Sequence, residues 1–222
     1  ETLGQISAGI NHELNQPLAA ISSYADNCRQ FFLKGRYDDA AWNMEQIGEL
    51  TDRMAQIGVQ LKAFSRKTSG EIEIIPVHGA IDGALEILSP TIKKNKVNIV
   101  IDIDPEDLEF FANHVFIQQV IVNLLSNAIH AVETVENPII RIVARVNDSM
   151  AQLEIMDNGP GISKENLDKI FEPFFTTKKS GHGLGLGLTI TERIIKEMSG
   201  KIIVETERNG GARFIILLPT PL

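Results

Sequence analysis

Apolar residues recur every three or four positions through the first third of the chain. One series spans residues 3–32 and a second spans residues 47–64, and this spacing places each series on one face of an α-helix. The polar segment 34–39 between them contains a glycine and indicates a turn. Residues 1–66 are therefore predicted to form two long antiparallel helices. The first contains Pro17, which removes a backbone hydrogen bond and should kink the helix.

A two-helix hairpin leaves part of its apolar stripe exposed, because each helix covers only one side of the other. Pairing with a second copy of the hairpin would bury the remainder in a four-helix bundle. The pattern therefore predicts a homodimer.

The pattern changes after the charged connector 66–71, and we place the domain boundary there. From here on, short apolar runs alternate along the sequence with longer amphipathic stretches, which is typical of strands and helices packed in layers. The expected strands are 72–75, 97–103, 139–146, 151–156, 201–205 and 213–218, and the expected helices are 77–95, 110–132 and 188–198. The fold class is α+β, with the helical hairpin in residues 1–68 and a mixed, mostly antiparallel sheet with its helices in residues 72–222.

The helix expected at 110–132 has no Asp, Glu, Lys or Arg, yet it carries too many neutral polar residues to be a membrane span. Gln119, Asn123, Asn127 and His130 lie three or four positions apart and so share one side of it. Carboxamides do not repel a triphosphate, and an amide oxygen suits Mg²⁺ when waters and phosphates complete its shell. The alternative is a row of buried amides that bond to neighbouring backbone.

Asp157 closes the apolar run 153–156 and precedes the glycine-rich turn 158–161. A strand that ends there would present one carboxylate where glycines let a ligand approach the backbone closely, and that carboxylate could accept hydrogen bonds from the amine of a base. Asn-Gly also favours a plain hairpin turn. The segment 163–170 argues against that alternative, because it has the pattern of a capped helical turn and not of a second strand.

A second glycine cluster occupies positions 181, 183, 185 and 187 and runs into the amphipathic helix expected at 188–198, which Gly200 ends. Free N–H groups and the positive end of the helix dipole make such a turn suitable for phosphate. A flexible linker is the alternative, but a linker would not alternate its glycines with leucines.

The segment 171–179 between the two glycine clusters carries three of the chain's ten phenylalanines and a pair of lysines. Long loops in compact domains are usually functional or disordered, and the aromatic side chains argue against plain disorder. We interpret the segment as a hinged lid with a lysine near phosphate.

His12 lies about 200° around the helix from the apolar stripe, because it is two positions from both Ile10 and Leu14. The imidazole is therefore expected to face solvent, next to Glu13 and close to the kink at Pro17. A neutral imidazole is a good nucleophile near pH 7, and a neighbouring carboxylate can hold the ring and take up its proton. On these residues alone, an ordinary surface histidine is an equal alternative.

Composition narrows the class of function. The net charge of −8 disfavours a general nucleic-acid binder. A single cysteine, Cys28, excludes an internal disulfide framework and leaves too few thiols for a zinc cluster. A reducing, cytosolic setting fits, and the sequence shows no targeting segment or long apolar span. The chain begins at Glu1 without a methionine, and we interpret it as a piece of a longer protein.

Five motifs resemble those of the two-component sensor histidine kinases, most closely the group that senses dicarboxylates or oxygen. Residues 12–18 resemble the phospho-acceptor box, 123–128 the N box, 157–161 the first glycine box, 171–174 the F box and 183–186 the second glycine box. The resemblance covers nearly the whole chain. Five motifs in family order are far more specific than any one of them.

This resemblance implies an autokinase in which residues 72–222 form a Bergerat-type (GHKL) ATP-binding domain, a two-layer sandwich of helices on a sheet. That domain would carry Mg·ATP to the helical hairpin, where His12 attacks the γ-phosphoryl group with Glu13 as general base. The phosphoryl group would then pass to an aspartate of a separate response regulator. The catalysis demanded is mostly positioning and charge neutralisation.

The family motifs also imply the residues of the site. Asp157 would bind the adenine amine, Asn127 would bind Mg²⁺, and Asn123 and His130 would help to hold the phosphates. The nucleotide-binding residues implied by the motifs are Asn123, Asn127, His130, Asp157, Gly159, Gly161, Ile162, Phe171, Thr177, Lys178, Gly181, Gly183, Leu184, Gly185, Leu186 and Gly187. The implied partners are a second copy and a response regulator, with no nucleic acid and no direct membrane contact, in the cytoplasmic portion of an inner-membrane sensor.

Three positions depart from the commonest family pattern. Gln16 lies four residues after His12, where many relatives carry threonine or asparagine to position water for dephosphorylation of the partner. Asn113 stands where aspartate is frequent, and Ala212 stands where a threonine hydroxyl often supports adenine binding. Phosphatase activity and one contact to adenine are therefore not implied.

Two other functions compete with the kinase. An ATP-hydrolysing clamp of the gyrase, Hsp90 and MutL type places a water-activating glutamate four residues before the magnesium asparagine. Here that position is Asn123, which cannot act as a general base, and those relatives lack an N-terminal histidine hairpin. The second rival is a non-catalytic dimerisation scaffold. The intact glycine motifs, Asn127 and the pair His12 and Glu13 weigh against it.

Overall fold

The computed structural model describes residues 2–65, 70–147, 149–177, 185–206 and 210–221, and it describes hairpin side chains from Leu14 onward except at 53, 56 and 59–65. The chain divides into two compact units. One contains Glu1–Arg66 together with Pro173–Leu186, and the other contains Lys67–Glu172 together with Gly187–Leu222.

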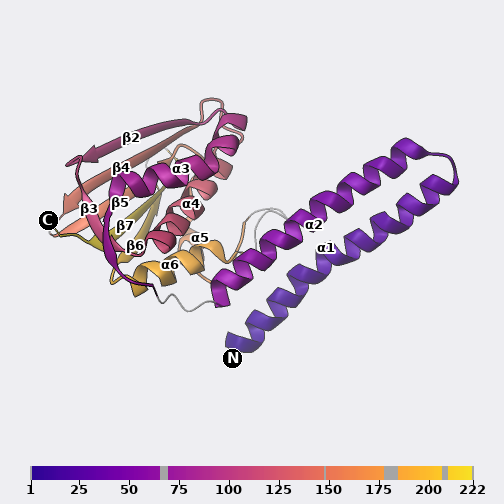
Figure 1. Cartoon of the computed structure of the whole chain (residues 1–222), viewed down its shortest axis with the longest axis horizontal. Helices are drawn as coiled ribbons and strands as arrows, with labels where there is room; N and C mark the ends of the chain where they lie inside the picture. Colours follow the sequence, from indigo (N-terminus) through magenta and orange to yellow (C-terminus); the bar gives the residue numbers. More distant parts are fainter. Residues whose placement is uncertain (1, 66–69, 148, 178–184, 207–209, 222) are drawn as a thin grey trace. The chain divides into compact units, whose positions relative to one another are not determined.

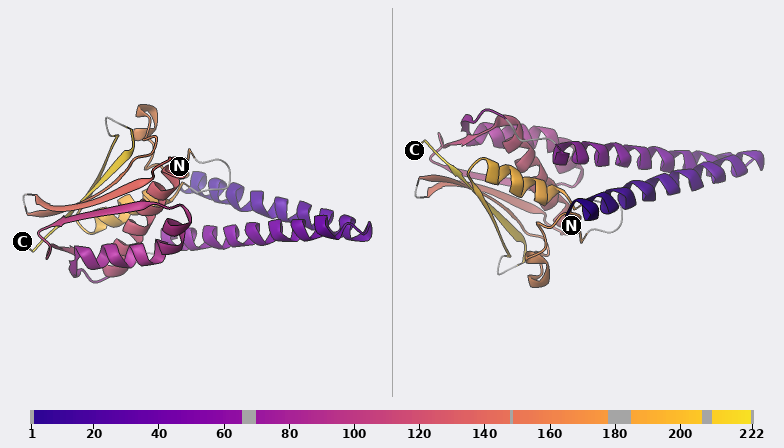
Figure 2. Two further views of the ribbon diagram at one scale, coloured as in Figure 1. Left: turned by 90° about the horizontal axis from the view of Figure 1, so that it is seen from above. Right: turned by 90° about the horizontal axis from the view of Figure 1, so that it is seen from below.

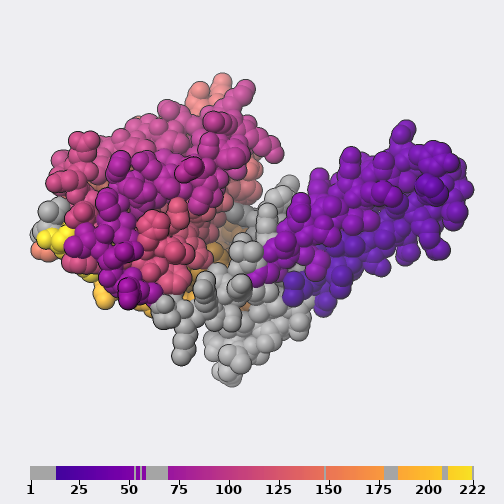
Figure 3. Space-filling view, viewed as in Figure 1, coloured from indigo at the N-terminus to yellow at the C-terminus, as the bar shows by residue number. Residues whose placement is uncertain are grey.

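Helix α1 (Thr2–Leu33) and helix α2 (Tyr37–Ser65) form the predicted hairpin and lie side by side (Figure 1, Figure 3). The turn is shorter than predicted, because only residues 34–36 separate the helices. Gly35 has φ 72°, a left-handed conformation that ends a helix without the strain a side chain would add. α1 continues through Pro17, whose side chain is buried.

The described part of the second unit contains a sheet of five strands. Their order is β2 (Asn98–Asp104), β4 (Ile139–Asn147), β5 (Met150–Asp157), β7 (Ala212–Pro219) and β6 (Lys201–Thr206). Among these, β2 and β4 run parallel and the other three pairs run antiparallel. The prediction of a mixed, mostly antiparallel sheet is confirmed.

Three helices cover one face of this sheet (Figure 1, Figure 2). They are α3 (Val77–Lys94), α4 (His114–Ala131) and α6 (Gly187–Glu197). The two layers, helices on a sheet, are those expected from the sequence. None of the helices in the described ranges is both long enough and apolar enough to cross a membrane.

The core lies between the sheet and these helices, and alternation along the strands builds it, because successive side chains point to opposite faces. Ile140, Ile142 and Ala144 of β4 are fully buried, and Leu153 and Ile155 of β5 are at most 2% exposed. α4 packs seven buried apolar side chains into the same layer. The alternate strand positions face the other side of the sheet, where charged, polar and apolar side chains are mixed.

The helix predicted at 110–132 begins later than expected. Its first residues belong to strand β3 (Glu109–Ala112), which pairs with β1 (Glu73–Pro76) in a separate two-stranded sheet. The side chain of Asn113 accepts a hydrogen bond from the Phe116 N–H over 3.2 Å and so caps α4. Periodicity missed this boundary, because an uncharged run as short as residues 110–112 suits a strand or a helix.

The segment 163–170 contains the short helix α5 (Lys164–Leu167), as predicted. Ser163 stands at its N-cap, but its side chain makes no capping hydrogen bond, so the capping part of that prediction is wrong. The Ser163 carbonyl oxygen instead accepts from the N–H groups of Asn166 and Leu167, over 2.9 and 3.1 Å. These backbone hydrogen bonds hold the turn.

Candidate functional site

Asp157 is the last residue of β5 and is only 8% exposed. Its Oδ1 atom accepts hydrogen bonds from the backbone N–H groups of Gly159, over 2.8 Å, and of Ala212, over 3.2 Å. Within the part of the chain that the structure describes, no donor bonds to Oδ2. One oxygen is thus fixed by the backbone, and the other is available to accept a hydrogen bond from the amine of a bound base.

Burial raises the pKa of the Asp157 carboxyl above its ordinary value, because a charged group is less stable away from water. The N–H groups of Gly159 and Ala212 act in the opposite direction, since they bond to the ionised form. A ligand that donates a hydrogen bond to Oδ2 would offset part of the remaining cost of burial.

Three glycines surround Asp157 where the chain leaves no room for a side chain. A Cβ atom on Gly159 would lie 2.7 Å from the Ala131 carbonyl oxygen and 2.9 Å from Asp157 Oδ1. Gly161 has φ 74° and Gly211 has φ 91°, a region that favours glycine. A Cβ atom on Gly211 would meet the Asp157 carbonyl oxygen. Close packing of backbone on backbone therefore requires these glycines, in addition to any approach by a ligand.

Asn158 ties the same turn to the start of β4. Its Oδ1 accepts a hydrogen bond from the Ile139 N–H over 2.9 Å, and its Nδ2 donates to the Asn137 carbonyl over 2.7 Å. Its backbone N–H also donates to the Ile139 carbonyl over 3.2 Å. These bonds explain an Asn-Gly pair that does not form a two-residue hairpin.

The polar face of α4 runs from Gly159, in the turn after β5, to Gly187, the first residue of α6. Near the end of α4, the Ala131 carbonyl oxygen packs against Gly159 of the first cluster. Earlier in the helix, the amide of Asn123 packs against Gly187, which begins α6. Positions 123 and 131 are separated by about 12 Å along a helix axis. Side chains on this stretch therefore lie between Gly159 and Gly187.

Asn123 also donates from Nδ2 to Thr191 Oγ1 over 2.9 Å, and Thr191 is 1% exposed. For Asn123, the alternative of an amide that bonds within the protein is therefore partly correct. Asn127 is half-buried, and so is His130, whose Nδ1 pairs with Glu133 Oε2 at 3.2 Å. Both side chains are partly accessible, Asn127 at the edge of the buried apolar face of α4 and His130 farther from that face.

The segment predicted to be a lid makes hydrogen bonds through its backbone at Phe171 and at Phe174. The Phe171 carbonyl oxygen accepts a hydrogen bond from Thr189 Oγ1 over 2.9 Å, in the first turn of α6. In the other unit, the Phe174 N–H donates to the Gly185 carbonyl over 3.0 Å. Phe174 and Gly185 have φ 67° and 65°, and Leu186, the next residue, is fully buried.

The remaining predicted residues divide into described and undescribed ones. The Ile162 carbonyl oxygen accepts a hydrogen bond from Thr206 Oγ1 over 2.8 Å, and Thr177 is exposed. His12 and Glu13 lie in α1, but their side chains are outside the described residues. Four predicted residues lie wholly outside them, namely Lys178, Gly181, Gly183 and Leu184. The roles of these six residues, like those of the other predicted site residues, stay predictions.

Sequence reasoning missed three threonines that hold the site, Thr189, Thr191 and Thr206. Two of them fall in the first turns of a helix that begins in a glycine cluster. Threonine hydroxyls near helix starts often bond to neighbouring backbone or side chains, which was the available signal. The partner of each hydroxyl is far along the chain, so the signal did not identify it.

The donor set fits a magnesium ion only when a nucleotide supplies further ligands. Among the described residues, no group of three or more His, Cys, Asp or Glu side chains could hold a metal ion. Mg²⁺ does not need such a group when it keeps waters and binds the phosphate oxygens of a substrate. The amide oxygen of Asn127 is a hard donor of the required kind.

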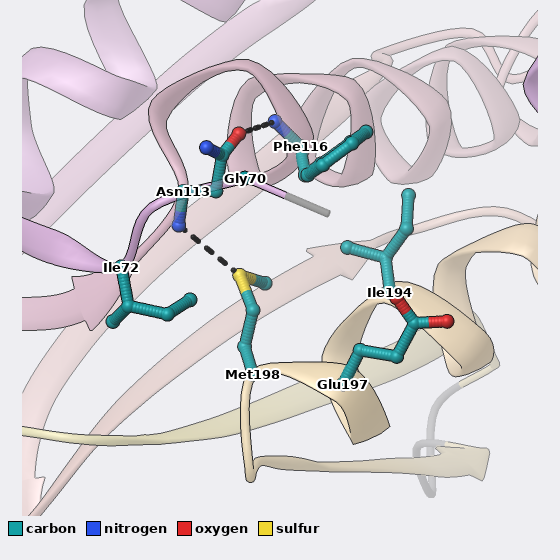
Figure 4. Close-up of a pocket in the computed structure, with 7 residues that line it drawn as sticks. All are labelled: Gly70, Ile72, Asn113, Phe116, Ile194, Glu197 and Met198. Atoms are coloured by element: carbon teal, nitrogen blue, oxygen red, sulfur yellow. Dashed lines mark hydrogen bonds between the residues drawn. The ribbon is translucent and has the colours of Figure 1, made fainter. Parts of the chain in front are cut away.

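A small pocket of about 80 Å³ lies between the N-terminal end of α4 and the C-terminal end of α6 (Figure 4). Its walls are mostly apolar, and on one of them the Asn113 N–H donates to the sulfur of Met198 at 3.4 Å. The lining residues are Gly70, Ile72, Asn113, Phe116, Ile194, Glu197 and Met198. None of the residues predicted to bind nucleotide lines it, so we do not assign the nucleotide to this pocket.

Known proteins resemble the chain over most of its length. Residues 112–222 match the model of the family described as histidine kinase-, DNA gyrase B- and HSP90-like ATPases. The C4-dicarboxylate transport sensor protein DctB of Pseudomonas aeruginosa is 39% identical over 211 residues, which are 95% of this chain and 34% of that protein. The chain spans about a third of the length of the curated relatives it matches first.

Solved structures resemble both units. The nucleotide-free catalytic domain of histidine kinase ThkA is 35% identical, with a TM-score of 0.61 over 68% of this chain and 96% of that one. ThkA solved in complex with the response regulator protein TrrA is 29% identical, with a TM-score of 0.81 over 98% of this chain and 61% of that one.

Proposed function

Because the chain belongs to the family of histidine kinase-, DNA gyrase B- and HSP90-like ATPases, and within it to the sensor histidine kinases, we propose that it is the autokinase core of a two-component sensor. The unit that contains the sheet binds ATP. The γ-phosphoryl group is transferred to His12, and an aspartate of a response regulator then accepts it. The order of the five motifs along the chain supports this proposal.

The observation that carries the proposal is the carboxylate of Asp157. It is buried, held at Oδ1 by two backbone N–H groups, and open to a donor at Oδ2. An adenine amine supplies such a donor, and guanine presents an acceptor at the same position. The site therefore selects ATP over GTP.

The phosphates extend along the polar face of α4 toward the start of α6. Asn123 and His130 donate hydrogen bonds there, and the N-terminal end of α6 supplies backbone N–H groups and a positive dipole end. Asn127 binds Mg²⁺ through its amide oxygen. The ion, when bound with the nucleotide, neutralises charge on the phosphoryl group as it transfers.

His12 is the nucleophile of the transfer step. A neutral imidazole nitrogen attacks the γ-phosphorus, the bond from that phosphorus to the bridging oxygen breaks, and ADP leaves. The other ring N–H loses its proton to the carboxylate of Glu13. Residues 14–18, which follow Glu13 in α1, include no lysine or arginine. The two side chains are neighbours in sequence, which supports this pairing of roles.

The hairpin is proposed to dimerise. Leu18, Ala25 and Phe32 of α1 are exposed and lie seven positions apart, so they form one stripe along the helix; Leu18 is 54% and Phe32 is 59% exposed. A second copy that packs against this stripe gives a four-helix bundle. Trp42 and Met44 of α2 are also exposed, on different sides of that helix.

The acceptor of the phosphoryl group is proposed to be a receiver domain of a response regulator, as the complex of the relative ThkA with TrrA supports. The curated relatives that the chain matches first are about three times as long as this chain. Their additional length supports a sensor in which this chain is the cytoplasmic portion, anchored by another part in the inner membrane.

The test is incubation of the full chain with γ-labelled Mg·ATP. The wild type should acquire label that is stable in alkali and labile in acid, whereas His12→Ala and Asn127→Ala should acquire none. His78→Ala and Asn147→Ala are matched controls, because both remove an exposed side chain of the same type from the same unit as Asn127. They should label like the wild type.

Other outcomes favour the competing functions. Release of free phosphate without labelled protein would indicate an ATP-hydrolysing clamp. ATP binding without either product would indicate a scaffold that has lost turnover. Label that survives the replacement of His12 would reject that residue as the acceptor.

A further inference from the structure

Arg213 joins three strands beside the Asp157 site. It is the second residue of β7, and its guanidinium donates to both carboxylate oxygens of Glu154 on β5, each over 2.8 Å. It also donates to Glu205 on β6 over 3.3 Å. A bidentate arginine–carboxylate pair restricts geometry more than a single contact, so this pair holds β5 and β7 in register.

Glu154 lies on the face of the sheet away from α3, α4 and α6. Its side chain is only 7% exposed, which is unusual for a glutamate. Desolvation pushes the pKa of its carboxyl upward, but hydrogen bonds from Arg213 and from Gln152, over 2.6 Å, together with the charge of Arg213, outweigh this and leave the pKa lowered. Glu154 is therefore ionised at neutral pH and holds the guanidinium as a charged partner.

The residue before Arg213 contacts the site directly. Arg213 is paired in register with Met156, and Ala212 donates its N–H to Oδ1 of Asp157, the residue after Met156. Successive residues of a strand face opposite sides, so the guanidinium lies on the far side of the sheet from the carboxylate. Arg213 therefore acts on Asp157 only through the backbone of β7.

Strand pairing also fixes that backbone, because Ala212 and Arg213 are in register with Thr206 and Glu205 of β6. The chain enters β7 through Gly210 and Gly211, at φ 85° and 91°, and glycine restricts its own backbone less than any other residue. Ala212 has no hydroxyl group, so β7 reaches Asp157 through a backbone N–H alone. In the described part of β7, Arg213 is the first side chain that bonds to another strand.

We propose that Arg213, held by Glu154, is a positioning residue for adenine selection. It keeps the Ala212 N–H against Asp157 Oδ1 and so directs Oδ2 toward the exocyclic amine. This inference rests on the proposed function of Asp157.

The test compares the affinity of the full chain for ATP and for purine riboside triphosphate, which lacks the amine. Arg213→Met keeps the length of the side chain and removes the charged donors. It should weaken ATP binding about three- to tenfold, the value of one hydrogen bond, and change binding of the purine analogue less than about twofold. Glu154→Gln should act in the same direction, and Arg213→Lys should recover part of the loss.

Arg145→Met is the matched control, because Arg145 pairs with Asp102 on the same face of the sheet, between β4 and β2. It should leave both affinities unchanged. Circular dichroism at the assay temperature verifies that each variant is folded.

Two results would overturn the inference, namely an unchanged affinity of Arg213→Met for ATP, or an equal loss for both nucleotides. Asp157→Asn separates this failure from failure of the proposed function. If Asp157→Asn weakens the binding of ATP and of the purine analogue equally, Asp157 does not bind the amine. If Asp157→Asn weakens the binding of ATP more than that of the analogue and Arg213→Met does not, only the role of Arg213 is rejected.

Discussion

The Ala131 carbonyl oxygen lies 2.7 Å from the position that a Cβ atom on Gly159 would occupy, so the last residue of α4 and the turn after β5 are in direct contact. This contact brings the end of the polar face of α4 to Asp157. It sets the separation between the carboxylate proposed to bind adenine and the amides proposed to bind the phosphates.

Gly159→Ala should disturb this contact. Neither of the atoms that the new methyl group would meet, the Ala131 carbonyl oxygen and Asp157 Oδ1, belongs to a flexible chain end. Overpacking of this kind costs about 1–3 kcal/mol, and we expect that loss in urea unfolding together with weaker ATP binding. Gly79→Ala, in α3 with open space around it, should be neutral or stabilising by up to about 1 kcal/mol. Equal behaviour of the two variants would contradict the packing described.

Thr191→Val should loosen the junction of α4 and α6. Valine has nearly the shape of threonine but leaves the Asn123 amide without its acceptor in a half-buried place. We expect the free energy of unfolding to fall by about 1–2 kcal/mol and the KM for ATP to rise. Thr51→Val is the control, since that exposed hydroxyl bonds only to its own helix. If Thr191→Val and Thr51→Val unfold at the same urea concentration, the hydrogen bond between Asn123 and Thr191 does not contribute to stability.

As the pH is lowered, the affinity for ATP should begin to fall at a higher pH than the affinity for an analogue without the amine. The pKa of Asp157 is raised from its ordinary 3.8, so Oδ2 takes up a proton at a pH above that value and no longer accepts a hydrogen bond. Titration of the two dissociation constants between about pH 7 and pH 4 measures this. Parallel curves for ATP and purine riboside triphosphate would contradict the role of Asp157.

Glu154 should stabilise the folded protein at neutral pH and lose this effect in acid. Its pKa in the folded protein is lowered below the ordinary 4.5, so its stabilisation is present above pH 4.5 and is lost as the pH falls through the lower folded value. Glu154→Gln should therefore be less stable than the wild type at neutral pH, by about 2 kcal/mol, and the difference should shrink in acid. A difference that does not change with pH would assign the effect to packing.

Leu18→Glu should shift the hairpin toward monomer, because it places a charge in the exposed stripe proposed to pack against a second copy. Light scattering at a fixed protein concentration measures the mass. Ser23→Glu adds the same charge to an exposed position five residues further along α1, on a different side of the helix, and should leave the mass unchanged. A wild type that is already monomeric would reject the dimer.

The elements with long, regular patterns could be predicted from the sequence. α1 and α2 repeat an apolar residue over many turns, and β4 and β5 alternate over eight or nine residues, so local periodicity determines their type. β3 is four residues long and was merged with the following helix. Too few residues show a period at that length, and the cap at Asn113 marks the boundary only once its bond is seen.

The site was predictable to the extent that single residues carry its chemistry. Asp157 at the end of an apolar run could be identified, but the N–H of Ala212 that holds it comes from a position 55 residues away. The same holds for the pair of Glu154 and Arg213, which are 59 residues apart. Such contacts depend on strand order, and no local pattern contains that information.

The neutral polar face of α4 implies an unusual response of nucleotide capture to ionic strength. Residues 114–131 carry no permanently charged side chain, while the whole chain has a net charge of −8 that repels a triphosphate at long range. Added salt screens that repulsion beyond about 8–10 Å but scarcely affects short contacts within the site. The association rate of ATP should therefore rise with salt, so that encounter is slowest in dilute buffer and retention changes little.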